Sequence, residues 1–187
     1  IYKAIEITRK KLEKKKSLIS FVGAPWTLLI YMLGLKDDKT KSRRENFKDF
    51  NLVKDKILGK LIKYLCIHIK NQINAGADVV QIFDSWAGLI PQSKLKDFCY
   101  VPNAKIVDFC KNYKIPNICF PKGIKQKYKD FNDFVKPDGI NLDSEIDPQW
   151  AKDKMRNVVF QGGLNPKVLL KSDKEIFKEA TKYIHIF

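Results

Sequence analysis

Arginine is scarce in this 187-residue chain, and its scarcity argues against some of the binding partners that a basic protein could have. Only four of the 36 basic residues are arginine, and the remainder are lysines spread over almost every helix-like segment. Proteins that read nucleic acid favour arginine, because its planar guanidinium makes paired hydrogen bonds to bases and phosphates. The formal net charge of +15 therefore indicates solvated surface first, attraction of an anionic substrate second and nucleic-acid binding third.

Cysteine is also sparse, and its spacing argues against a metal site or a disulfide framework. The four cysteines, Cys66, Cys99, Cys110 and Cys119, form no CxxC pair. Such a pattern predicts free thiols in a reducing cytosol. Cys66 and His68 lie two positions apart on a predicted helix and point about 200° away from each other, so they cannot chelate a metal together.

Long uncharged runs are limited to residues 18–35, which are long enough to suggest a membrane span. A central Gly-Ala-Pro and a change of periodicity on either side favour strand, turn and helix instead, so we expect no membrane insertion. The chain begins with Ile1 rather than methionine and ends in a strand-like run. We therefore expect one partial domain, over residues 1–187, that is truncated at both ends.

Short apolar runs alternate with amphipathic helical patterns along the chain. Strands are predicted at residues 17–22, 78–83, 117–120, 139–142, 157–161 and 183–187. Helices are predicted at residues 1–16, 25–35, 51–75, 93–112 (with a break at Pro102), 126–134, from 148 and at 166–180, and an exposed loop at 36–49. This alternation predicts an α/β fold of right-handed βαβ units. An open doubly wound sheet and a barrel both fit it.

Several side chains stand where chemistry could occur, and each also has an ordinary structural interpretation. Tyr31 lies in an apolar helix, where aromatic rings often serve packing, and Ser85 could cap the helix that follows it. His185 lies in the last predicted strand and is as readily a core residue. Asp84 and Asp143 end strands, and we expect them to be exposed at the carboxyl edge of the sheet, where α/β folds place ligands.

Two blocks of sequence share one pattern, an apolar strand followed by a turn and a helix. Residues 18–34 read LISFVGAPWTLLIYMLG, in which proline presets the first turn of the helix. This turn brings backbone N–H groups and Tyr31 to the carboxyl end of a strand. Residues 81–88 read QIFDSWAG and repeat the arrangement one unit later.

These blocks resemble signatures of the uroporphyrinogen decarboxylase family. Residues 21–32 resemble its Gly-Ala-Pro-Trp-Thr segment, with Tyr31 at the family's tyrosine, and residues 83–88 resemble its serine-bearing strand end. Residues 161–166, QGGLNP, resemble its Gln-Gly-Asn-Leu-Asp-Pro segment. The order and separations agree over essentially the whole chain, so it is identified as a member of the family.

Two positions depart from the third segment, since Gly163 replaces the usual asparagine and Asn165 the usual aspartate. The resemblance also implies that the family's arginine-rich loop and its aspartate lie on strands before Ile1. Its glycine-histidine-glycine turn would follow Phe187 by a few residues. His185 should therefore not be equated with the histidine of that turn.

The resemblance implies a (β/α)8 TIM barrel, of which this chain would supply roughly six of the eight βα units. It implies decarboxylation of the four acetate side chains of uroporphyrinogen III to give coproporphyrinogen III in tetrapyrrole (haem and chlorophyll) biosynthesis. No metal or organic cofactor is implied. The expected enzyme is a cytoplasmic homodimer at full length, with a tetrapyrrole substrate and no nucleic-acid or membrane partner. The 187-residue piece alone is expected to be inactive.

Residue roles carried over from the family fall on three positions. Tyr31 and Ser85 would hydrogen-bond carboxylates of the substrate, with Tyr31 also the catalytic candidate, and Phe21 would line the pocket against the ring. The turn at residues 23–25 would offer backbone donors to an anion. Together they would hold and desolvate the macrocycle while positive charge develops on it.

Two other functions remain open at this stage. Corrinoid or methylcobamide methyltransferases share the barrel superfamily and hold zinc with histidine and cysteines near strand ends. Cys119 closes a strand here, but no His-x-Cys partner lies at another strand end. A basic nucleic-acid-binding protein would use residues 9–11, 14–16 and Arg43-Arg44, yet no aromatic residues interleave with these runs.

Overall fold

The computed structural model describes residues 1–35 and 53–187 and contains one five-stranded parallel sheet. Its strands are β1 (Ile19–Gly23), β2 (Val79–Asp84), β3 (Asn117–Pro121), β4 (Gly139–Leu142) and β5 (Val159–Gly162). They confirm five of the predicted strands to within two residues. The predicted loop at residues 36–49 and the Arg43-Arg44 pair lie outside the described residues.

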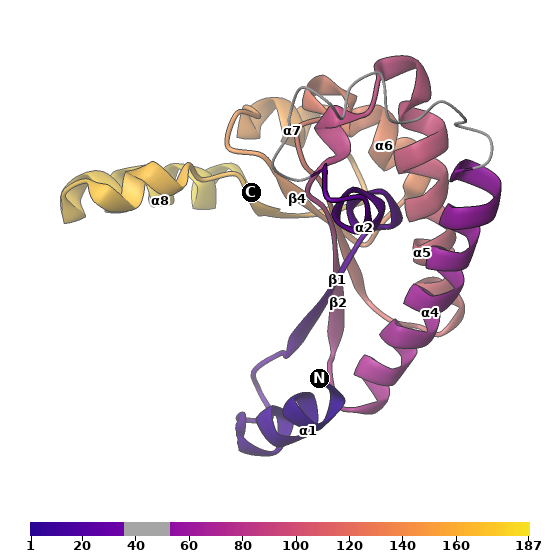
Figure 1. Ribbon diagram of the computed structural model, residues 1–187. Helices are drawn as coiled ribbons and strands as arrows, with labels where there is room; N and C mark the ends of the chain where they lie inside the picture. Colours follow the sequence, from indigo (N-terminus) through magenta and orange to yellow (C-terminus); the bar gives the residue numbers. More distant parts are fainter. Residues whose placement is uncertain (36–52) are drawn as a thin grey trace.

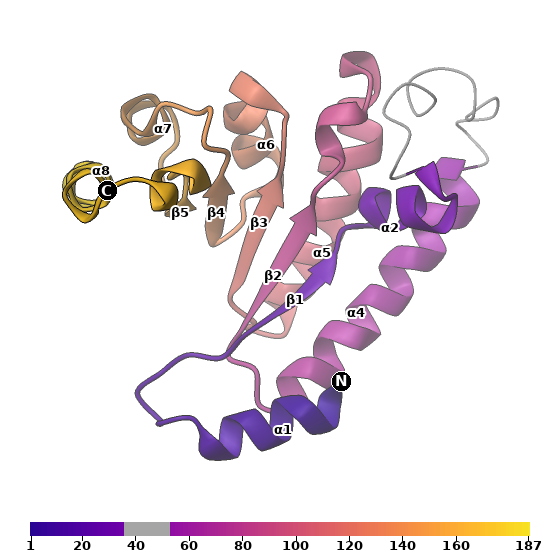
Figure 2. The same cartoon turned by 60° about the vertical axis from the view of Figure 1, so that its left-hand side comes forward.

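The order of the strands separates the two architectures that the periodicity left open. The strands lie side by side in the order β1-β2-β3-β4-β5, each parallel to the next (Figure 2). A doubly wound sheet reverses its strand order at a switch point, whereas barrel strands follow one another in sequence. The sheet is therefore the wall of an incomplete (β/α)8 barrel.

Helices alternate with the strands along the chain, and the central ones cover one face of the sheet (Figure 1). They are α1 (Tyr2–Lys11), α2 (Pro25–Met32), α4 (Gly59–Asn74), α5 (Val101–Asn112), α6 (Tyr128–Val135), α7 (Pro148–Lys154) and α8 (Asp173–Ile186). π-helical turns over Val53–Leu58 and Lys96–Tyr100 lead into α4 and α5, so the predicted break near Pro102 is confirmed as a junction. Figure 1 shows α4, α5 and α6 on one side of the sheet and α8 extending away from it.

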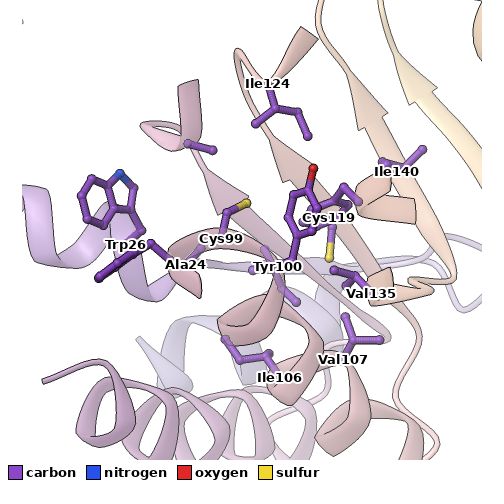
Figure 3. Close-up of a cluster of buried hydrophobic side chains, with 14 of the residues drawn as sticks. Ala24, Trp26, Cys99, Tyr100, Ile106, Val107, Cys119, Ile124, Val135 and Ile140 are labelled. Carbon is purple, nitrogen blue, oxygen red and sulfur yellow. The ribbon is translucent and has the colours of Figure 1, made fainter. Parts of the chain in front are cut away.

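Side chains alternate across the sheet as a period of two requires. The face toward the helices is buried and apolar, with Val22, Ile82, Cys119 and Ile140. Trp26, Cys99, Ile106 and Val107 pack onto this face from the neighbouring helices and turns (Figure 3). On the opposite face Phe21 and Val159 are exposed. In a closed barrel this second face becomes the interior.

The last predicted strand is wrong, because residues 183–186 belong to α8 and not to a sixth strand. Ser172 and Glu175 form a capping box that starts a helix, and apolar residues recur every three or four positions after it. His185 consequently lies exposed in the last turn of this helix rather than in a core strand. The described chain thus supplies five βα units instead of about six. The predicted helix at residues 166–180 is also two pieces, a 3₁₀ turn over Pro166–Leu170 and α8.

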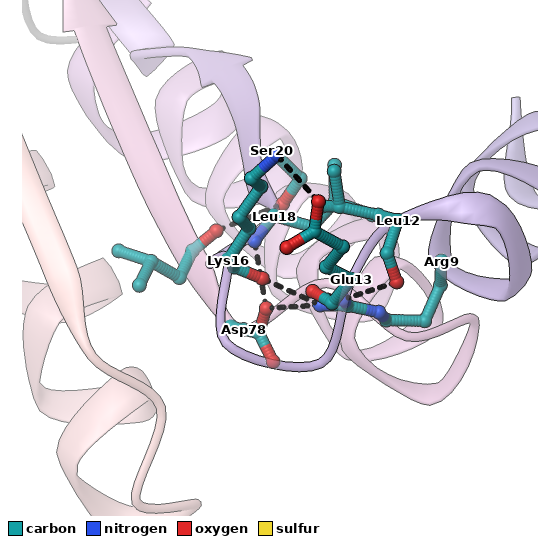
Figure 4. A network of polar contacts seen from close by, with 8 residues as sticks. Arg9, Leu12, Glu13, Lys16, Leu18, Ser20 and Asp78 are labelled. Atoms are coloured by element: carbon teal, nitrogen blue, oxygen red, sulfur yellow. Dashed lines mark hydrogen bonds and ion pairs between the residues drawn. The ribbon is translucent and has the colours of Figure 1, made fainter.

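An arginine fixes the turn between α1 and β1 at the amino-terminal end of the sheet (Figure 4). The guanidinium of Arg9 donates to Oδ2 of Asp78 at 2.8 Å and to three backbone carbonyls in residues 12–16. The same carboxylate oxygen accepts the backbone N–H of Leu18 at 2.7 Å. One side chain therefore ties α1, the turn and the start of β2 together.

Replacing Arg9 with methionine should lower the thermal unfolding midpoint of the protein that carries this chain. Losing hydrogen bonds from a charged group costs about 1.5–3 kcal/mol, and the partial exposure of both partners favours the lower end. Arg9→Lys should restore little, since one ammonium cannot replace a fork of donors. Calorimetry compares these variants with Arg156→Met, which removes an exposed arginine. Equal midpoints for Arg9→Met and Arg156→Met would show that the network contributes nothing.

Candidate active site at the carboxyl ends of the strands

The chain passes from β1 into α2 through one residue, which confirms the predicted strand, turn and helix. Pro25 is the first residue of α2, and a methyl group on Gly23 would lie 2.9 Å from the side chain of Leu28. The N–H of Ala24 donates to the carbonyl of Phe83 at 2.8 Å. Proline has no N–H, so neither residue can offer a donor to an anion. For these two residues the predicted backbone contact is wrong.

Asp84 ends β2 beneath α2 and α5, and it is buried with 1% of its surface exposed. Its Oδ1 accepts the hydroxyl of Thr27 at 2.9 Å, and its Oδ2 accepts the amide Nδ2 of Asn103 at 3.1 Å. Burial raises the pKa of Asp84 to about 6, because loss of solvent outweighs the stabilising hydrogen bonds. The prediction that Asp84 is exposed at the sheet edge is therefore wrong.

Tyr31 and Ser85 lie on neighbouring segments at this end of the sheet. Tyr31 is on α2 with 49% of its surface exposed, and half-buried Ser85 directly follows β2. The ring of Tyr31 stands edge-on to that of Trp86, with 6.4 Å between the centroids. Ser85 does not cap the next helical turn, since Trp86 occupies the N-cap position there. Within residues 1–35 and 53–187, no group hydrogen-bonds the hydroxyl of either Tyr31 or Ser85.

Phe21 lies on the helix-free face of β1, with 68% of its surface exposed. Its ring meets Phe83 of β2 edge-on at 5.9 Å, and Phe83 meets Phe120 of β3 at 6.1 Å. The three rings form a row across adjacent strands, which we call the aromatic row. It gives the carboxyl half of the bare sheet face an apolar wall.

A cavity of about 780 Å³ lies among the loops that follow β2, β3 and β4. Its lining includes apolar Ile90, Leu95, Ile124 and Ile146 and cationic Lys122 and Lys125. Phe21, Tyr31 and Ser85 do not line it. The cavity is therefore distinct from the three positions whose roles were carried over from the family.

Asp143 lines this cavity and, unlike Asp84, keeps part of its surface exposed. Its Oδ2 accepts the backbone N–H of Gly123 at 2.6 Å and the hydroxyl of Tyr128 at 3.0 Å. Burial and the neighbouring carboxylate raise the pKa of Tyr128. The Asp143 carboxylate thus ties the end of β4 to the loop after β3.

The third motif block forms the end of β5 and the turn after it. Gly162 and Gly163 have φ values of +74° and +88°, a region in which glycine is favoured. The hydroxyl of Tyr183 donates to the carbonyl of Gly163 at 2.9 Å. Asn165 caps the following turn by accepting the N–H of Lys167 at 3.0 Å, a role that aspartate fills equally well. This departure from the family pattern therefore keeps its local function.

His68 is an ordinary residue of α4, where Nδ1 meets the hydroxyl of Tyr2 at 2.7 Å and Nε2 meets Gln72 at 3.3 Å. Burial lowers the pKa of His68. In the part of the chain that the structure describes, no three His, Cys, Asp or Glu side chains are grouped to hold a metal ion. No helix there has the length and apolar character needed to cross a bilayer.

Comparison with known proteins decides the family. The family model described as Uroporphyrinogen decarboxylase (URO-D) matches residues 1–187. The chain belongs to this family. The uroporphyrinogen decarboxylase of Orientia tsutsugamushi (strain Boryong) is 40% identical, and the alignment covers 96% of this chain and 54% of that protein. The Rickettsia bellii (strain RML369-C) enzyme is 38% identical, and the alignment covers 96% of this chain and 53% of that protein. The enzyme of Wolbachia pipientis wMel is 33% identical, and the alignment covers 100% of this chain and 55% of that protein.

The chain thus spans about half the length of the curated uroporphyrinogen decarboxylases that it matches. Family membership confirms the resemblance and agrees with the incomplete barrel. The methyltransferase alternative is not favoured, because the family description and these relatives all name the decarboxylase.

Sequence reasoning missed the buried group formed by Thr27, Asp84 and Asn103. The partners of Asp84 lie 57 and 19 positions away along the chain, so no local pattern links them. The one available signal was a carboxylate at the end of an apolar strand with no cation nearby in the sequence.

Proposed function

We propose that this chain forms part of a uroporphyrinogen decarboxylase, which converts uroporphyrinogen III to coproporphyrinogen III in tetrapyrrole (haem and chlorophyll) biosynthesis. The observation that carries the proposal is the family match over the entire chain, with Tyr31 and Ser85 on adjoining segments. Because the chain spans about half of its relatives, the tests below use the full-length protein.

In this reaction the substrate supplies its own electron sink. When a pyrrole ring is protonated, the electron pair of the bond to the acetate carboxylate can move toward the ring as carbon dioxide leaves. A proton then returns to the methylene carbon and yields a methyl group. The protein must hold the macrocycle, exclude water and stabilise the positive charge on the ring.

Each candidate residue has a position that supports its role. The hydroxyls of Tyr31 and Ser85 would donate to substrate carboxylates, and both side chains are partly exposed. Phe21 would face the ring from the aromatic row. The lysine excess would attract a substrate that carries eight carboxylates through long-range steering.

Tyr31→Phe in the full-length protein should lower kcat/KM for uroporphyrinogen III by about tenfold or more. One hydrogen bond to a charged group contributes about 1.5–3 kcal/mol, and a factor of ten corresponds to about 1.4 kcal/mol. The matched control is Tyr113→Phe, which removes the hydroxyl of an exposed tyrosine after α5, at the opposite end of the sheet. Formation of coproporphyrinogen is measured for both. Identical kinetics for the two variants would remove Tyr31 from the site.

The same proposal places the enzyme in the cytoplasm as a homodimer that needs neither nucleic acid nor a cofactor. The four cysteines support the compartment, since all are free thiols and three are buried. Burial raises the pKa of Cys99, Cys110 and Cys119, which keeps these thiols protonated.

A further inference from the structure

We propose that Asp84 is a positioning residue, whose buried carboxylate holds the helix of Tyr31 and the strand end of Ser85 in one fixed arrangement. The inference rests on the proposed function, because it concerns the geometry of the two hydroxyls in that reaction. Asp84 itself touches neither hydroxyl. It acts through Thr27 and through the backbone of Trp86.

The carboxylate of Asp84 joins three elements that are distant in sequence. It ends β2, its Oδ1 accepts from Thr27 in the first turn of α2, and its Oδ2 accepts from Asn103 in α5. The backbone N–H of Thr27 also bonds to this carboxylate. All three side chains are buried, with no more than 2% of their surfaces exposed. A side chain from β2 thus satisfies the N-terminal end of α2, which Ala24 leaves without a side-chain cap.

From Thr27 the contacts continue to the segment that bears Ser85. The hydroxyl oxygen of Thr27 accepts the backbone N–H of Trp86 at 3.3 Å, and Nε1 of Trp26 donates to the Trp86 carbonyl at 3.0 Å. Residues from the start of α2 therefore hold both polar backbone groups of the residue next to Ser85. Tyr31 lies four positions after Thr27, one helical turn along α2, and its ring meets that of Trp86.

The hydrogen bonds around Asp84 favour a carboxylate over a carboxylic acid or an amide. Thr27 donates to Oδ1 of Asp84 while its oxygen accepts the N–H of Trp86, and Asn103 presents its N–H₂ group to the other carboxylate oxygen. A protonated carboxyl, or an asparagine in its place, would have to donate to Thr27 and would lose the charge-assisted hydrogen bonds, which are roughly twice as strong as neutral ones. Burying a charge without a cation is unfavourable, so a carboxylate buried at this strand end points to function.

The ionisation of Asp84 should make turnover depend on pH. Among the described residues, the titratable groups facing Asp84 are the thiols of Cys99, from the turn before α5, and Cys119 of β3. α2 and α5 contribute the uncharged Thr27 and Asn103. Burial raises the pKa of Asp84 to about 6, so the carboxylate is present above this pH and is lost as the pH falls through it. Turnover should fall with it.

The experiment measures kcat, KM and their pH dependence for decarboxylation of uroporphyrinogen III by the full-length protein. Asp84→Asn should lower kcat at least tenfold, and the loss of activity near pH 6 should disappear from its profile. Thr27→Val, which removes the hydroxyl and keeps the shape, should lower kcat about tenfold, whereas Thr27→Ser should stay within twofold of wild type. These losses should appear mainly in kcat, because Asp84 and Thr27 are buried away from the surface at which substrate would bind.

Asp138→Asn is the matched control for Asp84→Asn. Asp138 accepts the backbone and side-chain amides of Asn117 at the other end of the sheet, so its loss weakens the fold without moving Tyr31 or Ser85. Its kcat should stay within twofold of wild type. If Asp84→Asn does not fold, the Thr27 pair decides, since both variants keep the carboxylate.

The two levels of the proposal fail in different ways. The role of Asp84 would be overturned if the wild type is active and both Asp84→Asn and Thr27→Val keep kcat within twofold of it. It would also be overturned if Asp84→Asn still loses activity near pH 6 as the wild type does. A folded wild type that leaves uroporphyrinogen III unchanged would instead overturn the proposed function.

Discussion

Replacing Gly88 with alanine is expected to destabilise the protein by about 1–3 kcal/mol, the usual cost of forcing a methyl group into a packed site. The new Cβ would lie 2.8 Å from the carbonyl oxygen of Gly123 and 3.0 Å from its carbonyl carbon and Cα. All three atoms are backbone, so no side chain can turn aside to make room. The N–H of Gly88 donates to the backbone carbonyl of Lys122 at 2.9 Å, and the N–H of Gly123 donates to the carboxylate of Asp143. Neither loop can therefore withdraw without losing a hydrogen bond.

The measurement is the thermal unfolding midpoint, which should fall roughly 2–4 °C for each kcal/mol lost. Gly59→Ala is the matched control, because no atom of residues 1–35 or 53–187 lies within 4 Å of the position that a Cβ would take at this first residue of α4. Alanine is also the better helix former by about 1 kcal/mol, so this variant should be as stable as wild type or more so. If Gly88→Ala unfolds at the midpoint of Gly59→Ala, the loops after β2 and β3 are not in close contact.

Trp26→Ala is expected to cost about 3–5 kcal/mol, the usual range for deleting a buried aromatic side chain. Trp26 is fully buried under the carboxyl edge of the sheet (Figure 3). Its ring meets that of Phe98 edge-on, with 5.6 Å between the centroids. Its indole N–H also holds the carbonyl of Trp86. The substitution would leave a cavity and release the segment that follows Ser85.

Trp26→Phe reduces the loss of packing, because it keeps an apolar ring while it removes the N–H donor and the remaining part of the indole. It should cost about 1–3 kcal/mol, less than Trp26→Ala, because much of the buried ring stays and the Trp86 carbonyl keeps the N–H of Leu89. Urea denaturation of the full-length protein measures both variants. A Trp26→Ala midpoint equal to that of Trp26→Phe would mean that packing against Phe98 contributes little.

Local sequence signals predicted most of the elements because each of them acts within a few residues. Gly23 and Pro25 define the turn into α2 by close approach and a preset φ, and both effects can be read from the residues themselves. The short apolar runs likewise marked β1 to β5. The order of these strands came only from their pairing, since an alternating pattern is common to open sheets and barrels.

The errors arose where a short pattern was ambiguous or where the deciding partner was distant. Residues 183–187 alternate like a strand over five positions, and only the capping box of Ser172 and Glu175 identifies the helix that includes them. Asp84 was expected at the surface because strand ends usually are exposed. Its burial depends on Asn103 and Thr27, which the fold brings from α5 and α2.

The central claim is that the carboxyl ends of these strands belong to an enzyme that shortens the acetate side chains of a tetrapyrrole. The most direct measurement supplies uroporphyrinogen III to the purified full-length protein and identifies the products by mass. We predict successive losses of four carbon dioxide molecules, ending at coproporphyrinogen III, with a marked slowing in Tyr31→Phe and not in Tyr113→Phe. Recovery of unaltered uroporphyrinogen III from the folded wild-type protein would contradict the claim.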